Sequence, residues 1–202
     1  MVKYSNTELF ISLRRSDKGQ IRGNEIMKIL ITRHGETSWN KQNKVLGRTD
    51  IPLNETGIHQ AKELVEKLKD VSIQAVYASP LERAFRTGSL VAEDHGLECK
   101  TDDGLLEMNF GIYEGVSRDN PEYQAEKRKF FSKYPEGESF MNVAGRVYPF
   151  LDKLRRNYDD ETVLIVSHNG ICRVIANYFE NMTNEEFASF TIGNCEVREY
   201  TL

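Results

Sequence analysis

Two apolar runs that lie far apart in the chain each end at a histidine. The first run, Lys28-Ile29-Leu30-Ile31-Thr32, is followed by Arg33-His34-Gly35, and the second, residues 162–166, is followed by Ser167-His168-Asn169-Gly170. Short aliphatic and β-branched runs that stop at a loop are typical of buried strands. Because open α/β sheets bind ligands at the carboxyl ends of their strands, both histidines are predicted to lie at one such edge.

Between these two runs, helical and strand patterns alternate. The clearest helical pattern is the stripe formed by Ala61, Leu64, Val65 and Leu68, which are spaced as on one face of a helix. Strands that alternate with helices predict an α/β domain with a largely parallel sheet. The further predicted strands are residues 73–78, 98–101 and 196–202, and the further predicted helices are residues 81–94, 120–133, 139–158, 170–180 and 184–188.

The length of 202 residues fits one domain with a sizeable core. Residues 27–202 are predicted to form this domain, since Met27 directly precedes the first strand. Residues 1–26 hold only a short apolar cluster among basic residues and are predicted to be an appendage, with a surface helix packed on the domain as the alternative. Residues 105–140, here called the cap segment, break the alternation and are predicted to be an insertion that covers the site.

Charge and cysteine content argue against several classes of protein. The net charge of −4 does not fit a nucleic-acid binder, which would show a basic face. No apolar run approaches the ~20 residues that span a bilayer, so a membrane is not expected as a partner. Cys99, Cys172 and Cys195 match neither a disulfide framework nor a metal site, which favours a cytoplasmic location.

Basic residues follow three of the predicted strands. Arg33 and His34 follow the first, His168 follows the strand at 162–167, and Arg83 lies on the first turn of the helix after the second. Two arginines and two histidines in one pocket repel one another strongly unless an anion binds among them. Guanidinium groups match the oxygens of a phosphoryl group in bidentate fashion. The pattern therefore predicts a site for a small phosphorylated metabolite.

Glu107 is the candidate general acid of this site. Its apolar sequence neighbours are expected to desolvate the carboxyl group and raise its pKa, whereas the nearby cations are expected to lower it. A carboxyl group balanced between these effects can give a proton to a leaving oxygen and then take one from water.

Five short motifs follow one another along the chain. They are Arg33-His34-Gly35-Glu36-Thr37 with Asn40, Gly47-Arg48-Thr49-Asp50-Ile51-Pro52-Leu53, Ser79-Pro80-Leu81-Glu82-Arg83-Ala84, Phe110-Gly111-Ile112-Tyr113-Glu114-Gly115 and Ser167-His168-Asn169-Gly170. In this order and spacing, the motifs resemble those of the histidine phosphatase superfamily, in its phosphoglycerate-mutase-like branch. The resemblance extends from Met27 to Leu202 and implies a three-layer α/β/α sandwich whose mostly parallel sheet has one antiparallel edge strand.

The resemblance also implies roles for individual residues. His34 would be the nucleophile that forms a phosphohistidine, and Arg33, Arg83 and His168 would hold the phosphoryl oxygens. His34 must be neutral to attack, whereas His168 works best protonated, so the site must separate the two pKa values. The family uses no metal, and no cofactor is expected. Residues that would bind the substrate are Thr37, Asn40, Gly47 and Asn169.

Three functions remain open, of which hydrolysis of small-molecule phosphomonoesters is favoured. In the family's mutases the catalytic Glu is followed by Arg-His-Tyr-Gly, whereas Glu107 is followed by Met108-Asn109-Phe110-Gly111, as in the hydrolytic members. A cofactor-dependent phosphoglycerate mutase is the alternative, with Lys127 and Arg128 in place of the missing cations. An inactive phosphate-binding module is the third, although intact His34, Glu107 and His168 argue against it.

The basic run at residues 127–129 has two interpretations. It is either a solvated helix face or, given its place in the cap segment, a contact for a second anionic group of the substrate. The sequence predicts neither the identity of the substrate nor the oligomeric state.

Overall fold

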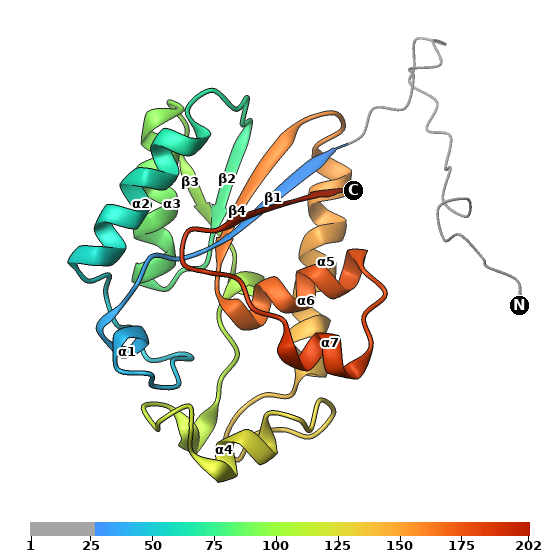
Figure 1. Cartoon of the computed structure of the whole chain (residues 1–202). Coiled ribbons are helices and arrows are strands. Elements are labelled where there is room, and N and C mark those ends of the chain that lie inside the picture. The colour runs from blue at the N-terminus through green and yellow to red at the C-terminus, as the bar shows by residue number, and fades with distance from the viewer. Residues whose placement is uncertain (1–26) are drawn as a thin grey trace, which may run out of the picture.

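A five-stranded mixed sheet forms the centre of the protein (Figure 1). The computed structural model describes residues 27–202, so the predicted appendage at 1–26 lies outside the described residues. The strand order is β3-β2-β4-β1-β5, and all neighbours are parallel except β5, which is antiparallel to β1 at the edge. The strands are β1 (Lys28–Arg33), β2 (Ala75–Ala78), β3 (Cys99–Thr101), β4 (Thr162–Ser167) and β5 (Val197–Thr201).

Helices cover both faces of the sheet, which confirms the predicted three-layer α/β/α sandwich (Figure 1). One face carries α2 (Glu55–Leu68) and α3 (Glu82–Asp94), and the other carries α5 (Phe140–Asn157) and α6 (Asn169–Phe179). Within residues 27–202, no helix has the length and hydropathy needed to cross a bilayer. The shorter elements are α1 (Ser38–Lys41), α4 (Pro121–Glu126), α7 (Asn184–Ser189) and the 3-10 turns η1 (Asp103–Leu105) and η2 (Gly111–Tyr113).

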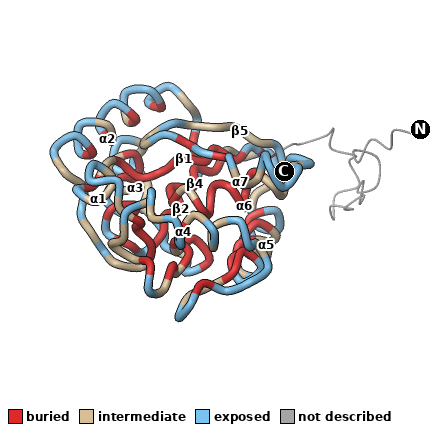
Figure 2. The backbone as a smooth tube through the Cα atoms, turned by 60° about the horizontal axis from the view of Figure 1, so that its bottom comes forward, coloured by how far each residue is buried: buried red, intermediate tan, exposed pale blue. Residues whose placement is uncertain are grey.

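The alternation of side chains along β1 explains the two layers of core. Ile29 and Ile31 are fully buried in the cluster formed with α5 and α6, whereas Leu30 is buried in the cluster formed with α2 and α3. Successive side chains of a strand point to opposite faces, so a strand buried on both sides must be apolar throughout. Each such burial contributes about 1.5–3 kcal/mol. In Figure 2 the buried backbone lies accordingly along the central strands and the inner faces of the helices.

The prediction of one helix over residues 120–133 is wrong. Asn120 caps α4 by accepting a hydrogen bond from the backbone N–H of Tyr123, but the helix ends at Glu126. Beyond it the chain is irregular, because Phe130 packs against the rings of Phe140 and Phe187. This tertiary packing outweighs the weak helical preference of the segment, which shows no continuous apolar stripe.

Candidate active site

The carboxyl ends of the central strands bring four of the predicted site residues together. Arg33 ends β1 and pairs in register with Ser167, which ends β4, so His34 and His168 follow directly at one edge of the sheet. The centroids of the two imidazole rings lie 5.1 Å apart at an interplanar angle of 61°. Arg83, on the first turn of α3, donates from Nε to Nε2 of His34 over 3.3 Å. All four side chains are buried.

The hydrogen bonds of His34 define one tautomer. Nδ1 lies 2.7 Å from the carbonyl oxygen of Gly35, which only accepts, so Nδ1 carries the proton. Nε2 faces the Arg83 guanidinium, which only donates, so Nε2 is the acceptor. Burial, followed by the charges of Arg83 and Arg33, holds the pKa of His34 well below its ordinary value. The structure therefore favours a neutral imidazole with its lone pair on Nε2.

Arg83 is held in place by the loop that follows α1. Nη2 donates to the carbonyl of Gly47 over 2.7 Å, and Nη1 donates to that of Thr49 over 3.0 Å. Asp50 forms an ion pair with Arg83 at 3.6 Å and also accepts from the backbone N–H that begins α3. A side chain at residue 47 would place its Cβ 2.6 Å from the carbonyl oxygen of Met108, so the loop requires glycine there. Burial lowers the pKa of Arg83 to about 10.

His168 is the N-cap residue of α6 and is fully buried. Neither ring nitrogen has a hydrogen-bond partner among the described residues. Burial, followed by the charges of Arg83 and His34, lowers the pKa of His168 well below its ordinary value. The free site thus favours a neutral imidazole, because a further charge buried beside two arginines is costly. The protonated His168 expected from the sequence concerns the site with a phosphoryl group bound, and it stays a prediction.

Glu107 lies in the same pocket as the N-terminal turn of α6. Its carboxyl group accepts from the backbone N–H of Met108 over 2.9 Å and from that of Gly170 over 3.2 Å. A Cβ at residue 170 would lie 2.6 Å from Oε1 of Glu107, so only glycine permits this approach. Burial raises the pKa of Glu107, although the two hydrogen bonds and the charge of Arg83 oppose the shift. The residue is accordingly suited to hold a proton.

A network of two arginines and one carboxylate fixes the backbone at Glu107. The carbonyl oxygen of Glu107 accepts from Nε of Arg48 over 2.5 Å and from Nη2 of Arg146 over 3.3 Å. Glu138 bridges these two arginines with ion pairs of 3.3 Å each and also accepts from the backbone N–H of Asn109. Although burial raises it, these bonds and charges leave the pKa of Glu138 below its ordinary value. None of the three network residues was among the candidates from the sequence.

The remaining residues predicted to bind the substrate lie on two helix starts. Thr37 and Asn40 form a capping box at α1, in which each side chain accepts a backbone N–H of the other. This arrangement leaves Nδ2 of Asn40 buried without a partner among the described residues. Asn169 begins α6, and its side chain accepts from the backbone N–H of Ile192 over 3.0 Å. The N–H groups of a first helical turn lack helical acceptors and attract anions.

Arg33 completes the basic edge of the site. Nη1 donates to the carbonyl of Ile192 over 3.3 Å, whereas Nε has no partner among the residues described. Burial lowers the pKa of Arg33 to about 10, and the charge of Arg118 contributes in the same direction. Even at this value the guanidinium stays charged at neutral pH.

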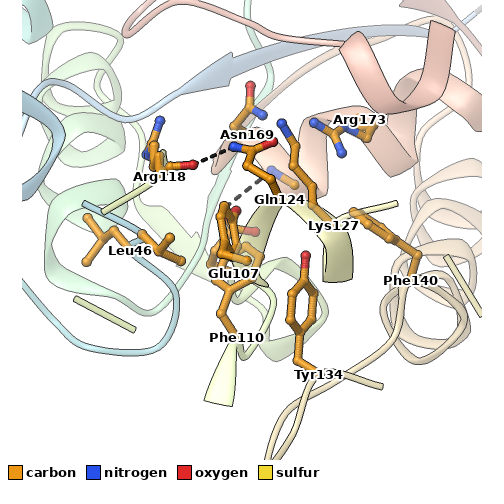
Figure 3. Close-up of a pocket in the computed structure, with 13 residues that line it drawn as sticks. Leu46, Glu107, Phe110, Arg118, Gln124, Lys127, Tyr134, Phe140, Asn169 and Arg173 are labelled. Atoms are coloured by element: carbon orange, nitrogen blue, oxygen red, sulfur yellow. Dashed lines mark hydrogen bonds between the residues drawn. The ribbon is translucent and has the colours of Figure 1, made fainter. Parts of the chain in front are cut away.

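A pocket of about 100 Å³ extends from Glu107 into the cap segment (Figure 3). The sequence interpretation missed three of its lining residues, Arg118, Tyr134 and Arg173. Arg173 had a detectable signal, because it is a charged residue inside the apolar run Ile171–Ala176 of α6. Arg118 and Tyr134 had none, since each lies in an irregular segment of mixed composition. Within residues 27–202, no cluster of His, Cys, Asp and Glu has the arrangement needed to hold a metal ion.

Comparisons with known proteins agree with this architecture. The family model of the histidine phosphatase superfamily (branch 1) matches residues 29–202. The chain is 39% identical over 142 residues to a protein of Bacillus subtilis named uncharacterized phosphatase PhoE, covering 70% of this chain and 72% of that protein. It is 30% identical over 176 residues to phosphoserine phosphatase 1 of Hydrogenobacter thermophilus, with coverages of 84% and 83%. The structure of a mycobacterial glucosyl-3-phosphoglycerate phosphatase superposes with a TM-score of 0.77 at 25% identity, covering 85% of this chain and 91% of that one.

Proposed function

The chain belongs to the histidine phosphatase superfamily (branch 1), and we propose that it is a metal-independent phosphatase that hydrolyses phosphomonoesters of small metabolites through a phosphohistidine on His34. The observation that carries this proposal is the state of His34. Its Nδ1 is protonated toward Gly35, and its pKa lies well below the ordinary value, so Nε2 keeps a lone pair at neutral pH. An uncharged nitrogen next to cations is what capture of a phosphoryl group requires.

In the first step, Nε2 of His34 attacks phosphorus and the bond from phosphorus to the ester oxygen breaks. In the free site Arg83 donates from Nε to the attacking nitrogen itself, and this bond must pass to a phosphoryl oxygen before Nε2 can attack. Arg33 has an unpartnered Nε at the same edge. Both guanidinium groups would hold the equatorial oxygens, on which the transition state carries negative charge. Loss of one such donor typically costs ~3–4 kcal/mol of barrier.

His168 would become charged when substrate binds. In the free site, burial and the neighbouring cations keep its pKa low. A phosphoryl dianion beside His168 brings opposite charge close to the imidazole, which raises the pKa again. The imidazolium then stabilises the transferring group without the cost of a buried charge in the free enzyme.

Glu107 would supply the proton that the leaving alkoxide needs. Its raised pKa keeps the carboxyl protonated at a higher pH than an exposed glutamate. In the second step a water molecule attacks phosphorus, Glu107 takes a proton from that water, and the bond between phosphorus and His34 breaks. The enzyme then returns to its starting state with phosphate released.

A phosphoglycerate mutase is the second candidate. The pocket holds Arg118, Lys127 and Arg173, and such cations would retain a second acidic group of a substrate while the phosphoryl group returns to it. A coupled assay that converts 3-phosphoglycerate to 2-phosphoglycerate only with added bisphosphate would favour this function. Absence of turnover on any phosphomonoester would favour an inactive phosphate-binding module.

The direct test is hydrolysis of p-nitrophenyl phosphate in the presence of EDTA. We expect steady turnover by the full chain and a loss of at least ~10³-fold in His34→Ala, since an enzyme without its nucleophile keeps only the catalysis from binding and charge. Turnover that needs an added metal, or that persists in His34→Ala, would contradict the proposal. A cytoplasmic location stays a prediction.

A further inference from the structure

Four donor side chains line the outer part of the pocket, and none of them takes part in the proposed phosphoryl transfer. Arg118 precedes α4, Lys127 directly follows it, Tyr134 lies in the loop beyond, and Arg173 lies on α6 (Figure 3). They are called here the outer donor group. Figure 3 shows Arg118 on one side of Glu107 and Gln124, with Lys127 and Arg173 on the other.

Two members of the outer donor group are buried with unused donors. Arg173 is 4% exposed and donates from Nη2 to the carbonyl of Phe190, but its Nε has no partner among the residues described. The hydroxyl of Tyr134 is likewise buried without a partner in the described part of the chain. An unpaired buried polar group costs about 1–3 kcal/mol, so two such donors facing one pocket call for a ligand that accepts hydrogen bonds.

The charges around this part of the pocket are unbalanced. Within residues 27–202, Arg118, Lys127 and Arg173 form no ion pair with any carboxylate. Burial, followed by the charges of Arg173 and Arg118, lowers the pKa of Lys127. Among the described residues that line the pocket, Glu107 alone carries a carboxyl group, and its raised pKa favours the neutral form. Three cations without a counter-ion favour binding of an anion.

We propose that the outer donor group binds a second anionic group of the substrate, so that the preferred substrates are small phosphomonoesters that also carry a carboxylate or a second phosphate. The inference rests on the proposed phosphatase function, because Glu107 and the start of α6 line the same pocket as the outer donor group. A molecule bound in this pocket therefore contacts both the proposed general acid and the outer donor group.

The same chemistry disfavours an amino group next to that anion. An ammonium placed among Arg118, Lys127 and Arg173 would meet like charge. Among the described residues that line the pocket, Glu107 alone carries a carboxyl group, and its raised pKa disfavours the ionised form. Burying an unpaired charge is costly, and like charges in a poorly solvated pocket repel strongly. Phosphohydroxy acids are therefore preferred to phosphoamino acids, which distinguishes this chain from a phosphoserine phosphatase.

Matched substrates test this preference in the full chain. 3-Phosphoglycerate differs from glycerol 3-phosphate by a carboxylate in place of a hydroxymethyl group, and from O-phosphoserine by a hydroxyl in place of an ammonium. Fructose 1,6-bisphosphate against fructose 6-phosphate tests a second phosphate. In at least one of these two comparisons, of 3-phosphoglycerate with glycerol 3-phosphate and of the bisphosphate with fructose 6-phosphate, we expect kcat/KM to be at least about tenfold higher for the substrate with the second anionic group. Charge-assisted hydrogen bonds are strong enough to give such a difference. We also expect 3-phosphoglycerate to exceed O-phosphoserine.

Two variants test whether the outer donor group causes the preference. Within the preferred pair, the preference is the ratio of kcat/KM for the substrate with the second anionic group to kcat/KM for the substrate without it. Lys127→Met is expected to lower this ratio about tenfold. Arg128→Met is its control, because it removes the same charge from an exposed neighbour that does not line the pocket. Tyr134→Phe is expected to lower the ratio about threefold or more. Tyr113→Phe is its control, since it removes a hydroxyl from the same aromatic cluster outside the pocket.

The outcomes separate this inference from the proposed function. If p-nitrophenyl phosphate is not hydrolysed, the phosphatase proposal itself fails. If it is hydrolysed but neither pair shows a preference for the substrate with the second anionic group, the second-anion subsite is overturned. A preference that Lys127→Met and Tyr134→Phe leave unchanged overturns the assignment to these residues. Better turnover of O-phosphoserine than of 3-phosphoglycerate overturns the exclusion of an amino group.

Discussion

At the residue scale, the two imidazoles of the site differ in what their nitrogens contact. His34 has a defined partner on each nitrogen, Gly35 and Arg83, whereas His168 has none among the described residues. Both have lowered pKa values for the same main reason, which is burial. The difference indicates that His34 is fixed in one tautomer, while His168 is free to change its proton count when an anion arrives.

The pH dependence of sulfate binding measures this change in the proton count of His168, because the charge of sulfate itself is constant near neutral pH. If His168 is neutral in the free site and protonated in the complex, each binding event takes up one proton, and the affinity falls as pH rises. Linkage sets the limit at about a tenfold loss of affinity per pH unit for one proton. Isothermal titration between pH 6 and 8 is the measurement, and His168→Gln is expected to show a smaller slope. Equal slopes in both proteins would assign the proton to another group.

Glu107→Gln separates the acid role from a binding role. The amide cannot give its proton to an alkoxide, but p-nitrophenolate leaves with little need for protonation. We expect kcat/KM, which reports the step that releases the alcohol, to fall at least about 100-fold on an alkyl phosphate such as glycerol 3-phosphate. The loss on p-nitrophenyl phosphate is expected to be at least about tenfold smaller. Steady-state kinetics on both substrates checks this. Equal losses of kcat/KM would contradict an acid role of Glu107 in the first step.

At the scale of elements, the cap segment and α5 position Glu107 through the network of Arg48, Glu138 and Arg146, here called the Glu138 network. Glu138→Gln keeps one acceptor oxygen, replaces the other with an NH2 donor and leaves Arg48 and Arg146 without their counter-charge. The uncompensated cations should lower the pKa of Glu107, so the basic limb of the kcat profile is expected to shift down by roughly 0.5–1 pH unit. Unfolding free energy is expected to fall by about 1–2 kcal/mol.

Glu136→Gln is the matched control for this prediction. It removes the same charge from an exposed side chain two residues away, and it should leave both the pH profile and the unfolding free energy unchanged. A loss of stability in Glu138→Gln without any shift of the profile would show that the network is merely structural.

The elements show where the sequence was informative and where it was not. Strand ends and the first turn of α3 follow from short-range patterns, so the meeting of Arg33, His34, Arg83 and His168 at one edge was predictable. The loop after α4 was not, because its course depends on packing of Phe130 against residues distant in sequence. For the same reason the Glu138 network, which joins three separate segments, left no local pattern.

At the scale of the whole molecule, two layers of helices enclose one sheet, and the candidate site lies at the carboxyl ends of its central strands. The fold class followed from the alternation of strands and helices, and the presence of one antiparallel edge strand followed from the resemblance to a family. The proposed second-anion subsite followed only in part. The sequence offered Lys127 as a contact for a second anionic group, but Arg118, Tyr134 and Arg173 join it only in the folded chain.

A chain that starts at Met27 is expected to keep the kinetics and the melting temperature of the full chain. Met27 is itself buried, and its carbonyl oxygen accepts from the backbone N–H of Leu202 over 2.9 Å, so the truncation leaves the described core intact. Comparison of kcat/KM and thermal unfolding of both chains is the measurement. A large drop in either would show that residues 1–26 belong to the functional domain.

Trapping the phosphorylated enzyme tests the central claim most directly. The full chain is mixed with p-nitrophenyl phosphate, quenched in alkali, where phosphohistidine is stable, and its peptides are analysed by mass spectrometry. We expect one phosphoryl group on His34, and neither label nor appreciable turnover in His34→Ala. A phosphoryl group on His168 or on any other residue, or full turnover by His34→Ala, would contradict the account.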